Sequence, residues 1–116
     1  MEYKNKKLII EKVRVENIVK SYGTPAYCYS FKQLKKNINN FKKNFKTFSP
    51  LICFAIKSNT NLGLIKEIKK FGLGADVVSM GELMLALRAG INPNKIVFSG
   101  VGKTSEEIKF AIDKKI

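Results

Sequence analysis

Lys57 is the lysine whose neighbours in the sequence most favour chemistry. It directly follows the apolar run 51–56 (Leu-Ile-Cys-Phe-Ala-Ile) and precedes the small polar residues Ser58 and Asn59. Such a run predicts a strand that is buried on both faces, as in a parallel sheet covered by helices. Partial burial at the end of that strand disfavours the ammonium form and leaves some free amine to attack a carbonyl. The pattern therefore indicates an amine suited to Schiff-base chemistry, with a solvated lysine as the alternative.

Two carboxylates could work beside this amine. Asp76 lies within the apolar run 74–78, and a buried carboxylate needs a partner, which Lys57 on the neighbouring strand could supply. The alternative places Asp76 on an edge strand facing water. Glu82 follows Ser79 by three residues, which is the spacing of a capping box at the start of a helix. That capping role explains Glu82 by itself, and a functional role is the second interpretation.

An alternation of short apolar runs with amphipathic helical patterns must position these groups. Apolar residues recur at spacings of three and four after each predicted strand. Capping-box pairs at helix starts, and glycines at helix ends, agree with this pattern. The predicted strands are 26–29, 51–56, 75–78 and 95–99, the capping pairs are Ser30 with Gln33, Ser79 with Glu82 and Thr104 with Glu107, and the terminal glycines are Gly72 and Gly90.

Strand–helix alternation with short loops predicts an α/β fold with a parallel sheet, either doubly wound or part of a (β/α)8 barrel. In both cases the carboxyl ends of the strands share one edge, where Lys57, Ser79 and Ser99 would lie. A complete barrel needs about 250 residues, so about four units form only part of one. Residues 1–23, with a strand at 7–10 and a helix at 13–22, form a lead-in segment before the truncated barrel of residues 24–116.

Composition narrows the function classes. The chain has 116 residues, 22 basic and 9 acidic, for a formal charge of +13, and all basic residues except Arg14 and Arg88 are lysines. Proteins that recognise nucleic acid usually rely on arginine, so this surplus of lysine is only weak evidence for nucleic-acid binding. A small basic nucleic-acid-binding module is the alternative from another class of function. The lack of histidine excludes histidine-based triads and histidine metal ligands, and no cysteine spacing suggests a metal. No signal-peptide pattern or membrane-length apolar stretch is present, so we expect a cytoplasmic protein without membrane contact.

Four stretches in order resemble the N-terminal part of the diaminopimelate decarboxylase family, whose members are pyridoxal-phosphate enzymes with an alanine-racemase-like barrel. They are 22–27 (Tyr-Gly-Thr-Pro-Ala-Tyr), 54–59 (Phe-Ala-Ile-Lys-Ser-Asn), 74–79 (Gly-Ala-Asp-Val-Val-Ser) with 81–83 (Gly-Glu-Leu), and 96–104 (Ile-Val-Phe-Ser-Gly-Val-Gly-Lys-Thr). Met80, where the family often has glycine, is a minor departure. The resemblance covers nearly the whole chain, and four motifs in the same order and spacing make it specific.

The resemblance implies that Lys57 forms the Schiff base with pyridoxal 5'-phosphate and that Asp76 holds the charge and position of this lysine. Glu82 matches a recurrent glutamate near the cofactor. The implied reaction removes CO2 from the D-configured centre of meso-2,6-diaminopimelate, a small amino-acid substrate, and yields L-lysine. Decarboxylases of the same fold that act on ornithine, arginine or carboxynorspermidine are the alternatives.

The family's other site residues come later in its sequences than any residue of this chain. These include the groups that bind the phosphate, stack on the ring and grip the substrate. The resemblance therefore implies an N-terminal fragment that is inactive alone, whose full-length parent is a homodimer.

Overall fold

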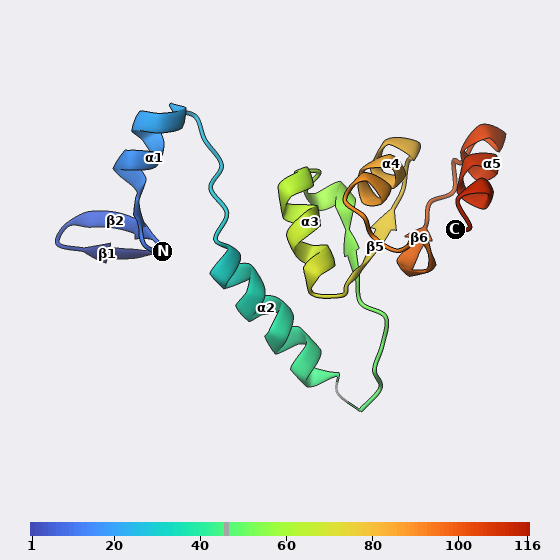
Figure 1. Ribbon diagram of the computed structural model, residues 1–116, viewed down its shortest axis with the longest axis horizontal. Coiled ribbons are helices and arrows are strands. Elements are labelled where there is room, and N and C mark those ends of the chain that lie inside the picture. Colours follow the sequence, from blue (N-terminus) through green and yellow to red (C-terminus); the bar gives the residue numbers. More distant parts are fainter. Residues whose placement is uncertain (46) are drawn as a thin grey trace. The chain divides into compact units, whose positions relative to one another are not determined.

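The computed structural model describes residues 1–45 and 47–116 (Figure 1). The chain divides into two compact units, Met1–Lys46 and Thr47–Ile116. Within the described ranges, every helix is too short or too polar to span a lipid bilayer.

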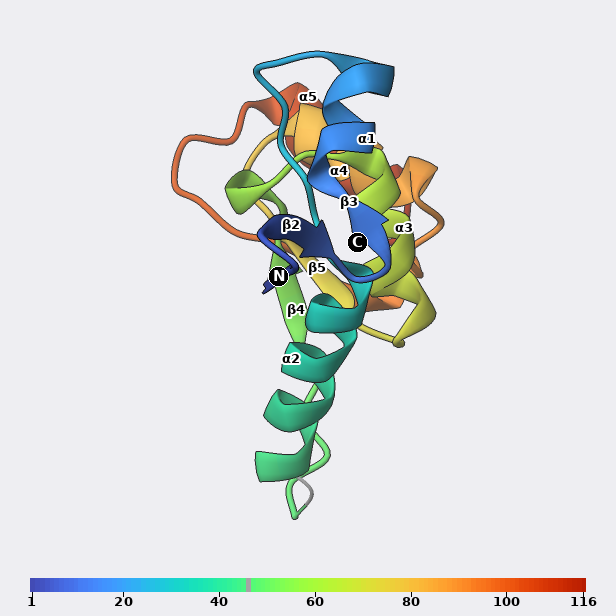
Figure 2. The same ribbon diagram turned by 90° about the vertical axis from the view of Figure 1, so that its left-hand side faces the viewer.

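The first unit begins with a small antiparallel sheet of β1 (Glu2–Lys4), β2 (Lys7–Ile10) and β3 (Val13–Arg14), in the order β1-β2-β3. Figure 2 labels β2 and β3 of this sheet. The strand predicted at 7–10 is confirmed with the same bounds. The predicted helix starts two residues later than expected, because Val13 and Arg14 pair with Ile10 and Ile9 in a strand. The elements are β1 (Glu2–Lys4), β2 (Lys7–Ile10), β3 (Val13–Arg14), α1 (Val15–Tyr22) and α2 (Phe31–Asn44).

Glu11, in the turn between β2 and β3, is hydrogen-bonded to the start of α2. Its Oε1 accepts hydrogen bonds from Ser30 Oγ and from the backbone N–H of Lys32, both at 2.8 Å. Ser30 is the N-cap residue of α2, and its hydroxyl accepts from the backbone N–H of Gln33. These hydrogen bonds, led by the one from the Lys32 backbone, hold the pKa of Glu11 below its ordinary value. A carboxylate distant in sequence thus assists the helix cap that the sequence predicted.

The prediction of a strand at residues 26–29 is wrong. These residues carry no ladder hydrogen bonds, and the Tyr27 side chain is 91% exposed. β-propensity describes how well a residue fits a pleated, half-buried surface, so it does not create a strand where no partner strand pairs. The helix predicted to follow is nevertheless present as α2.

The second unit contains a three-stranded parallel sheet in the order β4-β5-β6, interleaved with helices. This alternation confirms the predicted α/β class and fits part of a β/α barrel. The predicted runs 75–78 and 95–99 are both present within one or two residues. The elements are β4 (Cys53–Ala55), α3 (Leu62–Lys70), β5 (Gly74–Val77), α4 (Met80–Arg88), β6 (Ile96–Phe98) and α5 (Ser105–Asp113), with short 3-10 helices at Ile56–Ser58 and Pro93–Lys95.

One face of this sheet forms the core. Ala75 and Val77 of the central strand β5 are fully buried and belong to the same apolar cluster as Ile65 of α3 and Leu83 of α4. Because side chains alternate along a strand, Asp76 lies on the opposite face. The sheet therefore separates an apolar face packed against helices from a face that presents a carboxylate.

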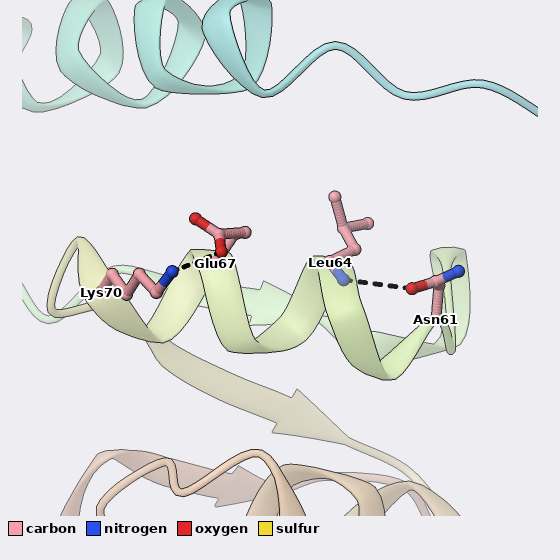
Figure 3. A network of polar contacts seen from close by, with 4 residues as sticks. All are labelled: Asn61, Leu64, Glu67 and Lys70. Atoms are coloured by element: carbon pink, nitrogen blue, oxygen red, sulfur yellow. Dashed lines mark hydrogen bonds and ion pairs between the residues drawn. The ribbon is translucent and has the colours of Figure 1, made fainter.

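Side-chain caps define where the helices of this unit begin. Figure 3 shows Asn61 at the start of α3, where its Oδ1 accepts the backbone N–H of Leu64 at 3.1 Å. The same figure shows the ion pair between Glu67 and Lys70 in the last turns of this helix. Gly72 and Gly90 adopt the left-handed conformation after α3 and α4, with φ of 74° and 81°, as expected from their positions.

The sheet leaves no room for a side chain at Gly74, which yields a stability prediction. A Cβ at this position would lie 2.0 Å from the Lys95 carbonyl oxygen and 2.9 Å from Cys53 Sγ. We expect Gly74→Ala to push β6 away from β5 and to destabilise the unit by roughly 1–3 kcal/mol. The measurement is the midpoint of urea unfolding. Gly81→Ala is the matched control, since a Cβ at Gly81 meets no atom within 4 Å and alanine favours the helix α4. Equal midpoints for the two variants would contradict this account of the contact.

Candidate functional site

Lys57 lies just beyond the carboxyl end of β4, in the short 3-10 helix Ile56–Ser58. Ile56 is fully buried and anchors this turn in the core, while the Ser58 hydroxyl donates to the Ala55 carbonyl at 2.8 Å. The backbone N–H of Asn59 donates to the Ile56 carbonyl at 2.9 Å and closes the turn. Lys57 thus extends its side chain from a fixed backbone at the expected edge of the sheet.

The environment of Lys57 differs from the sequence-based expectation. The run 51–56 is not buried on both faces: Leu51 is exposed, residues 52–55 are half-buried, and the strand itself covers only Cys53–Ala55. The Lys57 side chain is exposed. The reason is that β4 is an edge strand of the described sheet, with a packed core on one face. The desolvation inferred from the apolar run is therefore not provided by residues 1–45 and 47–116.

Asp76 lies in the central strand, paired in register with Ala55 of β4 on one side and with Val97 of β6 on the other. The alternative of an edge strand is therefore wrong for Asp76, and its side chain is half-buried. Its partner is Ser99, whose Oγ donates to Asp76 Oδ1 at 2.6 Å. Among the described residues, no ion pair joins Asp76 to Lys57. The hydroxyl at the end of β6, and not the lysine, holds the carboxylate.

Glu82 stands in the first turn of α4, where the capping role is largely confirmed. Ser79 is the N-cap residue, and its Oγ accepts from the backbone N–H of Glu82 at 3.3 Å. The Glu82 carboxylate accepts from the backbone N–H of Val78 at 2.9 Å, one residue before the position that a reciprocal capping box uses. The side chain therefore fixes the segment that links β5 to α4.

Glu107 makes a connection that the sequence pattern did not reveal. Its Oε2 accepts from the Thr104 backbone N–H at 2.9 Å, which completes the predicted capping box of α5. Its Oε1 accepts from the backbone N–H of Met80 at 3.1 Å, at the first residue of α4. The capping spacing with Thr104 signalled the first bond, but a contact across 27 residues has no local signal. One carboxylate thus holds the starts of two helices together, at the edge where Lys57 and Asp76 lie.

These hydrogen bonds predict a pH-dependent contribution of Glu107 to stability. The bonds from the Thr104 and Met80 backbones hold the pKa of Glu107 below its ordinary value. A lowered folded-state pKa stabilises the fold fully above the ordinary glutamate pKa, and this stabilisation is lost as the pH falls through the lowered value. We expect Glu107→Gln to lower the thermal unfolding midpoint by a few degrees at neutral pH and to weaken its dependence on acid.

The check is a series of thermal unfolding curves from neutral to acidic pH. Glu106→Gln is the matched control, because it removes the same charge from the neighbouring exposed position of α5. Equal shifts in the two variants would assign the effect to net charge and not to the two backbone hydrogen bonds.

Metal chemistry has no candidate ligand cluster here. Across residues 1–45 and 47–116, no group of three or more histidine, cysteine, aspartate or glutamate side chains could hold a metal ion. The chemistry-bearing side chains at the carboxyl edge of the sheet are the amine of Lys57, the carboxylate of Asp76 and the hydroxyl of Ser99.

Comparisons with known proteins agree on one family. The model of the family described as "Pyridoxal-dependent decarboxylase, pyridoxal binding domain" matches residues 31–116. Diaminopimelate decarboxylase of Aquifex aeolicus is 43% identical over 116 residues, which is all of this chain and 27% of that protein. The crystal structure of diaminopimelate decarboxylase from M. jannaschii in co-complex with L-lysine superposes with a TM-score of 0.94 at 36% identity, covering 99% of this chain and 28% of that one.

A second structure, diaminopimelate decarboxylase from Helicobacter pylori complexed with L-lysine, gives a TM-score of 0.83 at 43% identity, covering 88% of this chain and 26% of that one. The chain therefore spans about a quarter of the length of these relatives. The superpositions confirm the partial β/α barrel expected from the sequence. Because the family model covers well over half of its residues, this chain belongs to the pyridoxal-dependent decarboxylases.

Proposed function

We propose that this chain is the N-terminal part of a decarboxylase that binds pyridoxal 5'-phosphate and converts meso-2,6-diaminopimelate into L-lysine and CO2. The observation that carries the proposal is the placement of Lys57. Its exposed amine follows β4 of a parallel sheet, beside the strand that carries Asp76, within the segment that matches the family. A relative that bears this enzyme name is 43% identical over the whole chain.

The side chains at this edge of the sheet fit the cofactor. Pyridoxal phosphate carries an aldehyde that an accessible primary amine can take up, and Lys57 offers such an amine on a fixed turn. When bound, the cofactor accepts the electrons left behind as CO2 departs. Lys57 would hold the cofactor, and its Nζ, when free, would move a proton to or from the substrate carbon.

The two carboxylates have different proposed roles. Asp76 presents a negative charge on the strand next to β4 and would favour the positively charged form of the Lys57 nitrogen. Glu82 fixes the turn from β5 into α4 through the Val78 backbone, and we assign it to the cofactor surroundings on the basis of that position.

The arrangement of the whole protein follows from the same family relationship. We propose that residues 24–116 begin its barrel after a lead-in segment of residues 1–23. We also propose that the whole protein is a cytoplasmic homodimer whose cofactor and substrate contacts are completed by later residues.

The test is a substrate panel with the purified whole protein and added pyridoxal phosphate. We expect L-lysine and CO2 from meso-diaminopimelate, and no product from the L,L isomer, which lacks a D-configured centre. Ornithine, arginine and carboxynorspermidine are the comparison substrates. Faster turnover of one of these would reassign the substrate within the family, and no turnover of any of them would overturn the proposed activity.

A further inference from the structure

The Asp76 carboxylate is held from one side only. Its Oδ1 accepts the hydrogen bond from Ser99 Oγ at 2.6 Å, while its Oδ2 accepts no hydrogen bond from the residues that the structure describes. The side chain is half-buried on the central strand of the sheet. A half-buried carboxylate with one free oxygen retains an acceptor for a cationic or N–H donor.

Ser99 owes its position to the sheet. It directly follows β6, and its backbone N–H donates to the Val77 carbonyl of β5 at 2.9 Å, which extends the parallel ladder by one residue. The hydroxyl therefore approaches Asp76 from a backbone that is fixed to the same strand. The short distance between Oγ and Oδ1 is typical of a hydrogen bond to a charged acceptor, which is stronger than a neutral one.

The other side of Asp76 faces β4, the strand that leads to Lys57. Asp76 pairs in register with Ala55, two residues before the lysine. The charge of Asp76 also affects Cys53 of β4. Burial is the main cause that raises the pKa of the Cys53 thiol, and the negative charge of Asp76 raises this pKa further. The charge of Asp76 thus acts on β4, while the hydroxyl of Ser99 holds it from β6.

We propose that Ser99 is a positioning residue for the cofactor lysine, acting through Asp76. By occupying Oδ1, the Ser99 hydroxyl orients the carboxylate so that Oδ2 is the oxygen left to accept the charged Lys57 nitrogen. This inference rests on the proposed function, because it requires Lys57 to carry pyridoxal phosphate. In this role Ser99 acts through its hydrogen bond to Asp76, and no bond is formed or broken at its hydroxyl.

The test follows the visible absorbance of pyridoxal phosphate bound to the whole protein as the pH is raised. A carboxylate beside the lysine nitrogen favours its protonated form, so losing the carboxylate lowers the pH midpoint of the absorbance change. We expect Asp76→Asn to lower the midpoint by about one unit or more. Ser99→Ala should lower it by a smaller amount in the same direction, and Ser99→Thr, which keeps a hydroxyl, should restore it. Ser105→Ala removes an exposed hydroxyl in the first turn of α5 and should leave the midpoint unchanged.

The double variant Ser99→Ala with Asp76→Asn separates positioning from a general structural effect. If Ser99 acts through Asp76, the double variant has the midpoint of Asp76→Asn alone. A wild-type midpoint in Ser99→Ala, with or without a loss of thermal stability, overturns the inference. The inference is also overturned if Ser99→Ala shifts the midpoint as much in the Asp76→Asn background as it does in the wild-type background.

Reduction with borohydride distinguishes a failure of the positioning role from a failure of the proposed function. Reduction should fix the cofactor on Lys57, as a mass increase of the peptide that contains this residue. Wild-type protein without that increase contradicts the proposed function itself, whereas the increase with an unshifted Ser99→Ala midpoint contradicts only the positioning role. Ser99→Cys, which fills the site with a slightly larger side chain and a weaker donor, gives the same comparison if the alanine variant does not fold.

Discussion

Replacing Lys57 by alanine is expected to abolish both the proposed covalent attachment of pyridoxal phosphate and the proposed decarboxylase activity of the whole protein. The amine of this residue is exposed on a turn fixed by the buried Ile56, so alanine removes the nucleophile with little cost to the fold. Loss of the proton transfer at Nζ alone would lower the rate by about 10²–10⁴-fold. Loss of the cofactor lowers it further, because the carbanion left by CO2 then has no electron acceptor.

Two further variants test whether the amine of Lys57 is needed or only a positive charge at this position. Lys57→Arg keeps the positive charge but offers no amine that can attack an aldehyde, so it should also lack the visible absorbance band. Lys66→Ala removes an exposed lysine from α3 in the same unit and should keep both the band and the activity. The measurements are the absorbance spectrum with added pyridoxal phosphate and the rate of L-lysine formation. A retained band in Lys57→Ala would place the cofactor on another lysine.

Local patterns predicted the elements of this fold well where the signal is carried by neighbouring residues. Ser30, Ser79 and Thr104 each accept the expected backbone N–H at a helix start, since capping depends on residues only three positions apart. The strand Lys7–Ile10 was also predicted with its observed bounds. The failed strand at 26–29 shows the limit of such patterns, because pairing needs a partner strand that no local window contains.

The partners at the candidate site were harder to predict. The position of Lys57 at the edge of the sheet followed from the apolar run, but its exposure depends on which faces of the sheet are covered. Asp76 was correctly placed beside β4, yet its hydrogen bond goes to Ser99, 23 residues later. Charge complementarity favoured a lysine, whereas the order of the strands brings a serine within reach on the other side. Strand order is a property of the whole sheet, so a pairwise argument from charge did not detect it.

The isolated chain of residues 1–116 is expected to show no decarboxylase activity, even with saturating pyridoxal phosphate. It spans about a quarter of the length of its relatives, and its described residues contain three strands of the parallel sheet. Lys57 is exposed to water and Asp76 is only half-buried, which weakens the electrostatic interactions on which the proposed chemistry depends. L-lysine formation from meso-diaminopimelate by this purified chain, at a rate near that of the whole protein, would contradict the expectation.

The same incomplete sheet predicts self-association of the isolated chain. In the described part of the chain, β4 and β6 are both edges of the parallel sheet, and each edge offers unpaired backbone groups to another copy. Large apolar side chains of β6 and α5 are exposed: Val97 of β6 is 48% exposed, and Ile108 and Ile112 of α5 are 45% and 65% exposed. Sedimentation of the isolated chain over a range of concentrations should therefore show species larger than a monomer.

Replacing Ile108 and Ile112 by lysine should reduce this association, because these variants place charge on the exposed apolar surface of α5 and not in the core. A chain that stays monomeric at all concentrations would show that these edges are adequately protected in isolation.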